Sequence, residues 1–125
     1  MSGRVLIVDD SSLARRRARG ILEGGGYEVI EAEDGMAALE RYFVERPDVV
    51  LLDLVMKGMY GLEVLTKLRQ IDPQARVIVV SADVQTSSHE LVTAAGAAGF
   101  LVKPLDERDA LALVGAAVAG SPHAD

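Results

Sequence analysis

Short runs of aliphatic, largely β-branched residues recur along the chain, and each is followed by a longer stretch of mixed polarity. A continuous run of valine, isoleucine and leucine is typical of a strand buried on both faces, as in a parallel sheet. The run around residue 29 is weaker because polar and apolar residues alternate in it. The predicted strands are Arg4–Val8, Tyr27–Ile30, Val49–Leu52, Val77–Val80 and Phe100–Val102.

The stretches between these runs carry apolar residues at the spacing of a helix. Ser11, Ser12 and Asp106 are residue types that begin helices, whereas Pro47 and Pro73 stop them. The expected core-facing positions are Leu13, Ala14, Ile21 and Leu22, then Ala37, Ala38, Phe43 and Val44, then Leu62, Val64, Leu65 and Leu68, then Leu91, Val92, Ala94 and Ala95, and finally Leu111, Leu113, Val114 and Val118. Alternating strands and helices predict an α/β fold, with helices on both faces of a parallel sheet and right-handed crossovers.

The length of 125 residues suits a single domain, with a core over about residues 4–119 and a frayed tail at 120–125. The absence of cysteine excludes disulfide scaffolds, thiolate zinc sites and cysteine nucleophiles. A net charge of -6 argues against a surface that binds nucleic acid directly. The longest apolar run, Leu111–Gly120, is shorter than the ~20 residues of a membrane-spanning helix, and no signal peptide is visible. We therefore expect a cytoplasmic domain that does not interact with membranes.

Polar residues follow four of the predicted strands. Asp9 and Asp10 come after the first strand, Asp53 after the third, Ser81 after the fourth and Lys103 after the fifth. Because the carboxyl ends of parallel strands share one edge of a sheet, where ligands bind, we expect these side chains to converge there.

The expected group is suited to phosphoryl chemistry. Carboxylates held close together repel one another, and burial increases that cost, so a cation is needed. Oxygen ligands select Mg²⁺, Mn²⁺ or Ca²⁺, and a site with few protein ligands favours Mg²⁺. One carboxylate can act as a nucleophile, while the ammonium and hydroxyl groups stabilise charge on a transferring phosphoryl group. Each residue alone also fits a turn, a helix cap or a solvated loop, and only the joint pattern predicts a phosphoryl-accepting aspartate.

The segments that carry these residues resemble the receiver domain of two-component response regulators. The resemblance covers the chain from about Val5 to Val118. The matching segments are Val5–Ser11, Leu51–Leu54, Gly61–Leu65, Val80–Ala82 and Gly96–Pro104. It implies a flavodoxin-like, doubly wound five-stranded sheet with the strand order 2-1-3-4-5.

The resemblance also implies roles for individual residues. Asp53 corresponds to the phosphorylated aspartate. Asp10 corresponds to a direct Mg²⁺ ligand, and Asp9 to a neighbour that acts largely through water. The backbone carbonyl of Val55 corresponds to a further metal ligand, and Mn²⁺ can replace Mg²⁺.

The remaining implied roles belong to the conformational switch. Ser81 corresponds to the switch hydroxyl, Lys103 to the lysine that pairs with the phosphoryl group, and Phe100 to the switch aromatic residue. The bond between Lys103 and Pro104 is expected to be cis, which proline tolerates at a cost of ~0.5–1 kcal/mol.

The implied activity is a phosphorylation-driven switch rather than an enzyme acting on external substrates. A sensor histidine kinase or a histidine phosphotransfer protein donates a phosphoryl group to Asp53. Ser81 then moves toward the phosphate, Phe100 rotates into the space, and the surface of the fourth helix, fifth strand and fifth helix changes for a downstream protein. The domain is expected to be a monomer or a phosphorylation-linked homodimer.

Other readings of the sequence stay open. The chain can be the receiver module of a longer regulator, a phosphorylation-independent interaction module, or a small phosphatase with Asp53 as nucleophile. The chain length argues against the phosphatase because it leaves no room for a substrate domain.

Several further positions bear on function. Lys57 and Tyr60 replace a proline and an aspartate common in the family, which puts the geometry of the loop after Asp53 in doubt. The arginine run at 15–19 predicts a solvated helix face, with Glu23 available to Arg19. The resemblance implies, as an alternative, that this helix is a kinase-docking surface. His89 is expected on the surface, and the resemblance implies that Val55 and Asp83 tune the rate of phosphate loss.

Overall fold

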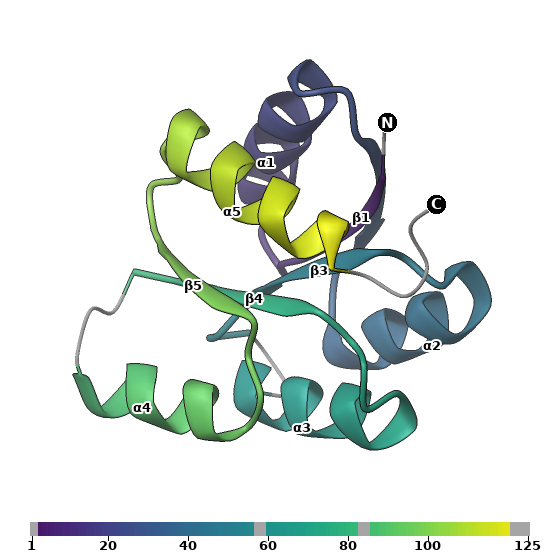
Figure 1. Ribbon diagram of the computed structural model, residues 1–125, viewed down its shortest axis with the longest axis vertical. Helices are drawn as coiled ribbons and strands as arrows, with labels where there is room; N and C mark the ends of the chain where they lie inside the picture. Colours follow the sequence, from purple (N-terminus) through teal and green to yellow (C-terminus); the bar gives the residue numbers. More distant parts are fainter. Residues whose placement is uncertain (1–2, 57–59, 83–85, 121–125) are drawn as a thin grey trace.

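A computed structural model describes residues 3–56, 60–82 and 86–120, and for residues 86–88 only the backbone is described. Strands and helices alternate along the chain (Figure 1). The strands are β1 (Arg4–Val8), β2 (Glu28–Ala32), β3 (Val49–Asp53), β4 (Val77–Ser81) and β5 (Gly99–Val102). The helices are α1 (Ser12–Gly24), α2 (Gly35–Glu45), α3 (Gly61–Ile71), α4 (Thr86–Ala94) and α5 (Glu107–Ala119).

The strands form one parallel sheet in the order β2-β1-β3-β4-β5, which confirms the predicted fold class. Helices α1 and α5 lie on one side of the sheet, and α2, α3 and α4 lie on the other (Figure 1). The strand order reverses direction between β1 and β3, so the loops after these two strands diverge and leave a crevice at the carboxyl edge.

The central strands are buried on both faces, as their continuous aliphatic sequences predict. Their side chains alternate between two apolar clusters. The cluster beneath α2, α3 and α4 contains Leu6, Val50, Leu52, Leu65 and Leu68. The cluster beneath α1 and α5 contains Val5, Leu22, Leu51, Ile78 and Val114. The sheet is therefore the shared wall of two cores.

Five side chains predicted to face the core are instead exposed. Ala94 is one of them. The other four are exposed by more than half of their area: Leu13 (71%), Phe43 (63%), Val44 (69%) and Leu91 (58%). Helix geometry explains two of these errors, because α2 buries Ala38 and Tyr42, four residues apart. Residues 43 and 44 are rotated off that face by roughly 100° per residue. Tyr42, which the apolar pattern missed, is 1% exposed and donates a hydrogen bond to Asp72 Oδ2 at 2.8 Å.

Helices α1 and α5 start at the predicted capping residues. Ser11 Oγ accepts a hydrogen bond from the Ala14 N–H at 3.2 Å, and Asp106 Oδ2 accepts one from the Asp109 N–H at 3.0 Å. Among the described helices, none has the length and apolar character needed to cross a bilayer. The predicted tail lies outside the described residues from 121 onward.

Candidate functional site

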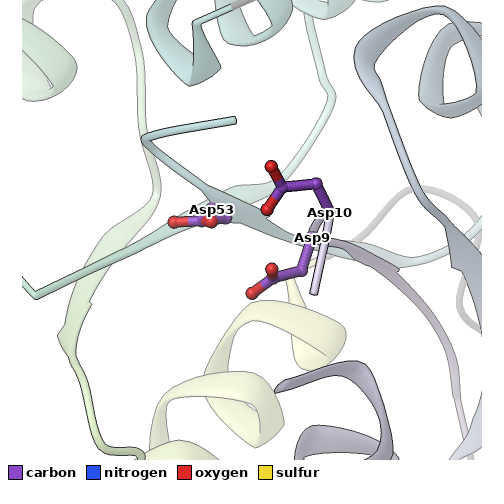
Figure 2. A group of neighbouring side chains, drawn as sticks. All are labelled: Asp9, Asp10 and Asp53. Atoms are coloured by element: carbon purple, nitrogen blue, oxygen red, sulfur yellow. The ribbon is translucent and has the colours of Figure 1, made fainter. Parts of the chain in front are cut away.

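Three aspartates meet at the carboxyl edge of the sheet, where β1 and β3 end side by side (Figure 2). Val8 pairs with Leu52, and the next residues along the two strands are Asp9 and Asp53. One carboxylate oxygen from each of Asp9, Asp10 and Asp53 lies within 4.8 Å of the other two. Asp9 and Asp53 are buried and Asp10 is exposed, so the cluster has one face open to solvent.

Lys103 brings a positive charge to this cluster from the end of β5. Its Nζ donates a hydrogen bond to Asp9 Oδ2 at 2.9 Å and lies 3.5 Å from Asp53 Oδ2. The Lys103 N–H also donates to the backbone carbonyl of Ser81 at 2.9 Å, which holds the ends of β4 and β5 together. The peptide bond to Pro104 is cis, as expected. Ser81 is 2% exposed at this edge.

Burial raises the pKa of the Asp53 carboxyl, and the nearby charge of Asp9 raises it further. Lys103 and the N–H of Val55, 3.3 Å from Asp53 Oδ1, act in the opposite direction without reversing the shift. Burial lowers the pKa of Lys103, but its contacts with Asp9 and Asp53 outweigh this and leave the pKa raised. The cluster therefore holds more negative charge than its lysine neutralises.

The donor set fits a hard divalent cation. Carboxylate oxygens are the preferred ligands of Mg²⁺ and Mn²⁺, and the open side next to Asp10 leaves room for the waters that Mg²⁺ retains. The Val55 side chain is 61% exposed, and the backbone N–H of this residue contacts the cluster by donating to Asp53 Oδ1. Lys57 and Asp83 lie outside the described residues, whereas Tyr60 is 70% exposed.

Gly61 lets the start of α3 approach the backbone that follows Asp53. A Cβ atom at this position would lie 2.5 Å from the Asp53 carbonyl oxygen and 2.6 Å from Leu54 Cα. The Gly61 N–H donates to the Leu54 carbonyl at 2.8 Å. The resemblance includes this glycine, but its reason, the close approach of two backbones, becomes visible only in the fold.

Phe100, to which the resemblance assigns the role of switch aromatic residue, lies on β5. Its ring is half-buried and packs against the cluster beneath α2, α3 and α4. The imidazole of His89 covers it, with ring centroids 5.0 Å apart and an interplanar angle of 53°. His89 is exposed, as predicted, but sequence patterns gave no sign of this aromatic pair across α4 and β5.

The arginine run on α1 is divided among several partners. Arg19 forms the expected ion pair with Glu23 at 2.9 Å, and its Nε contacts Glu31 at 2.6 Å. Arg17 Nη2 donates to the Leu105 carbonyl at 3.0 Å. The face is therefore neither simply solvated nor wholly available for docking.

A largely apolar cavity of about 420 Å³ adjoins the acidic cluster. It lies between the start of α1 and the loop joining β5 to α5, and its lining includes Leu13, Ala14, Pro104 and Leu105. Asp53 and Lys103 also line it, so apolar surface is continuous with the charged site.

Comparison with known proteins identifies relatives of the whole fold. The response regulator receiver domain family matches residues 5–115. The chain is 44% identical over 105 residues to the chemotaxis protein CheY of Bacillus subtilis, covering 83% of this chain and 88% of that one. The receiver domain of the putative response regulator NarL from Mycobacterium tuberculosis is 35% identical, with a TM-score of 0.89, over 95% of this chain and 98% of that one. A CheX–CheY–BeF3–Mg²⁺ complex from Borrelia burgdorferi is 34% identical, with a TM-score of 0.87, over 91% of this chain and 87% of that one.

Proposed function

The chain belongs to the response regulator receiver domain family, and on this premise we propose that it is a switch activated by phosphorylation of Asp53. The observation that carries the proposal is the meeting of Asp9, Asp10 and Asp53 with Lys103 at one edge of the sheet. A buried carboxylate next to an ammonium group and a cation site matches the needs of phosphoryl transfer.

The phosphoryl donor is a phosphohistidine of a sensor kinase or phosphotransfer protein. An Asp53 carboxylate oxygen attacks phosphorus, the phosphorus–nitrogen bond breaks, and the imidazole keeps the electron pair and takes up a proton. The product is an aspartyl phosphate. Water reverses the modification by attacking phosphorus and breaking its bond to Asp53, which releases inorganic phosphate.

A divalent cation, Mg²⁺ or Mn²⁺, would be held by Asp10, by Asp53, by Asp9 largely through water, and by the Val55 carbonyl. When bound, it neutralises negative charge around the phosphoryl group. Lys103 already contacts Asp9 and Asp53 and can reorient its ammonium group toward a phosphoryl oxygen. Ser81 supplies a hydroxyl from the end of β4, beside the Lys103 backbone.

The output of the switch is the surface formed by α4, β5 and α5. Movement of the Ser81 hydroxyl toward the phosphoryl group makes space for Phe100, whose ring links β5 to His89 of α4. Phe100 has no hydroxyl, so its inward state depends on packing alone. When two states differ by only a few kcal/mol, one charge-assisted contact can reverse which of them is more populated.

Partners are expected on two surfaces. The exposed Leu13 and the adjoining apolar cavity offer the phosphodonor protein a contact next to Asp53. A downstream protein is expected to bind the α4, β5 and α5 surface; for comparison, the Borrelia burgdorferi relative is found in a complex with CheX. We assign the domain, core residues 4–119, to the cytoplasm, either by itself or as a module of a longer regulator, as a monomer or a phosphorylation-linked dimer.

Incubation with Mg²⁺ and a small acyl phosphate tests the proposal. We expect one acid-labile phosphoryl group in the wild-type protein and none in Asp53→Asn, measured by intact-protein mass spectrometry. Equal labelling of the variant would place the nucleophile elsewhere. No labelling of either protein would favour a phosphorylation-independent interaction module, and steady hydrolysis of general phosphate esters would favour a phosphatase.

A further inference from the structure

We propose that Arg15 is a positioning residue that sets the direction of the Asp10 carboxylate for cation binding. The proposal rests on the proposed function, because it concerns the same metal site. Arg15 lies on the first turns of α1, outside the acidic cluster, and the side chain is 15% exposed. Its role follows from the backbone atom that it holds.

Arg15 joins three elements next to the acidic cluster. Its Nη1 donates to the Asp9 backbone carbonyl at 2.6 Å, and its Nε donates to Glu31 Oε1 at 2.9 Å. Glu31 lies on β2 and pairs in register with Ile7 of β1. The planar guanidinium therefore connects α1, β2 and the end of β1, which a lysine ammonium could not do in the same geometry.

The Asp9 carbonyl is part of the peptide group that links Asp9 to Asp10. A peptide group is planar, so fixing its oxygen fixes the orientation in which the Asp10 backbone begins. The other polar groups of Asp9 are also held: its N–H donates to Ala32 at 3.2 Å, and its carboxylate accepts from the Ser11 N–H and from Lys103, each at 2.9 Å. Arg15 supplies the contact that extends this order to Asp10.

Glu31 keeps a partner when Arg15 is changed. Arg19 Nε contacts Glu31 Oε2 at 2.6 Å, and this hydrogen bond is the main reason that the pKa of Glu31 is lowered, against the opposing effect of burial. Replacing Arg15 thus leaves Glu31 ionised and paired with Arg19. The replacement therefore removes the hydrogen bond to the Asp9 carbonyl, one of the two arginine contacts of Glu31, and the charge of Arg15 itself.

Arg15→Gln distinguishes the effect of the Arg15 contact on Mg²⁺ affinity from the effect of the Arg15 charge. Loss of a positive charge near a cation site would by itself strengthen Mg²⁺ binding, whereas loss of the carbonyl contact weakens it because the peptide group between Asp9 and Asp10 is less firmly oriented. Partners that orient metal ligands are worth about 10–100-fold in metal affinity, and we expect about 10-fold weaker Mg²⁺ binding. Arg15→Lys retains the charge without the two-pronged contact, and we expect it to bind Mg²⁺ more weakly than wild type as well.

The measurement is isothermal titration of the unphosphorylated protein with Mg²⁺ alone, with thermal unfolding in Mg²⁺-free buffer as a second readout. Arg16→Gln is the matched control, because Arg16 is the exposed neighbour on the same helix and should leave Mg²⁺ affinity unchanged. Should Arg15→Gln fail to fold, Arg15→Lys carries the test.

The outcomes separate this proposal from the proposed function. Weaker Mg²⁺ binding by both Arg15 variants, with Arg16→Gln unchanged, supports the positioning role. Unchanged or tighter binding by the variants, including the case in which only thermal stability falls, overturns it while leaving the proposed function intact. Failure of the wild-type protein to bind Mg²⁺ overturns both.

Discussion

The Asp53 side chain must be ionised in an environment that disfavours its ionised form. A phosphoryl acceptor must be ionised to attack, yet burial and the charge of Asp9 raise the pKa of this carboxyl. Lys103 and the Val55 N–H lower the pKa of Asp53, but by less than burial and Asp9 raise it. Part of the negative charge at Asp53 is therefore uncompensated. The uncompensated charge explains why a divalent cation fits this place, and it also means that the site lowers the stability of the cation-free protein.

Asp53→Asn should therefore stabilise the protein in Mg²⁺-free buffer at neutral pH, although it removes an ion-pair partner of Lys103. A carboxyl whose pKa is raised by folding binds its proton more tightly in the folded state, so stability falls as pH rises through the folded pKa. The difference in the free energy of unfolding between Asp53→Asn and wild type should thus be small in acid and increase with pH to a plateau. Urea unfolding across pH measures it.

Asp9→Asn tests whether the charge of Asp9 contributes to the raised pKa of Asp53. Asp9 raises the pKa of Asp53 by its charge, so neutralising Asp9 should diminish the pH dependence attributed to Asp53. An Asp53→Asn protein that is less stable than wild type at neutral pH without Mg²⁺ would show that Lys103 over-compensates the buried charge.

Much of this site is visible in the sequence because strand ends are visible. Asp53 and Ser81 are the last residues of their strands, Asp9 and Lys103 come directly after theirs, and the parallel topology brings all four together. The proposed positioning role of Arg15 could not be predicted from strand ends. It depends on the direction of one carbonyl group and on Glu31 from another strand, and neither has a periodic signal in the chain.

At the scale of elements, the junction between β3 and α3 depends on Gly61. The Gly61→Ala methyl group would collide with the backbone of Asp53 and Leu54, which is not a flexible neighbour that can move aside. We expect a loss of about 1–3 kcal/mol, as for other overpacked sites. Slower phosphorylation of Asp53 should accompany it, because the displaced backbone carries the nucleophile.

Chemical denaturation and acyl phosphate labelling measure the two effects of Gly61→Ala. Gly24→Ala is a suitable control, since a Cβ atom there would meet no neighbouring atom within 4 Å. Equal stability and equal labelling rates for wild type and Gly61→Ala would refute the close-approach explanation.

The side chains of helix α4 are described for residues 89–94, and Val92 is the buried one among them, whereas α3 buries Val64, Leu65 and Leu68. This part of α4 therefore has fewer buried side chains than α3. Few buried contacts permit local opening at low free energy. We expect α4 amides to exchange with deuterium faster than α3 amides in the unphosphorylated protein, by hydrogen-exchange mass spectrometry. Protection of α4 equal to that of α3 would contradict this expectation and weaken the case for α4 as the responsive element.

The existence and order of the elements followed from aliphatic runs and capping residues, but the buried face of each helix did not. On α2 the apolar residues Phe43 and Val44 suggested one face, and the structure buries Tyr42 instead. The sequence alone does not show whether a tyrosine is buried, because its ring suits a core and its hydroxyl needs a hydrogen-bond partner. The partner, Asp72, lies beyond α3 and could not be assigned without the fold.

Across the whole molecule, two cores share one sheet, so a defect in one should weaken the entire domain. Leu65→Ala removes a fully buried side chain of α3 and should lower the free energy of unfolding by about 2–5 kcal/mol. Leu91→Ala removes a leucine that is 58% exposed and should change stability by less than about 0.5 kcal/mol. Urea unfolding followed by circular dichroism compares them.

The shape of the Leu65→Ala transition tests the shared-sheet account. A single transition, shifted as a whole, is expected because neither core can persist after the sheet is lost. Two separated transitions would instead show that the α1 and α5 side folds independently of the α2, α3 and α4 side.

The central claim is that a phosphoryl group at Asp53 changes the α4, β5 and α5 surface of the molecule. Backbone amide NMR spectra recorded with Mg²⁺, before and after addition of beryllofluoride as a phosphoryl mimic, test it most directly. The account predicts large shifts around Asp53 and Ser81 that extend through Phe100 into α4 in the wild-type protein, and none of these in Asp53→Asn. Shifts confined to the acidic cluster, or the same shifts in the variant, would contradict it.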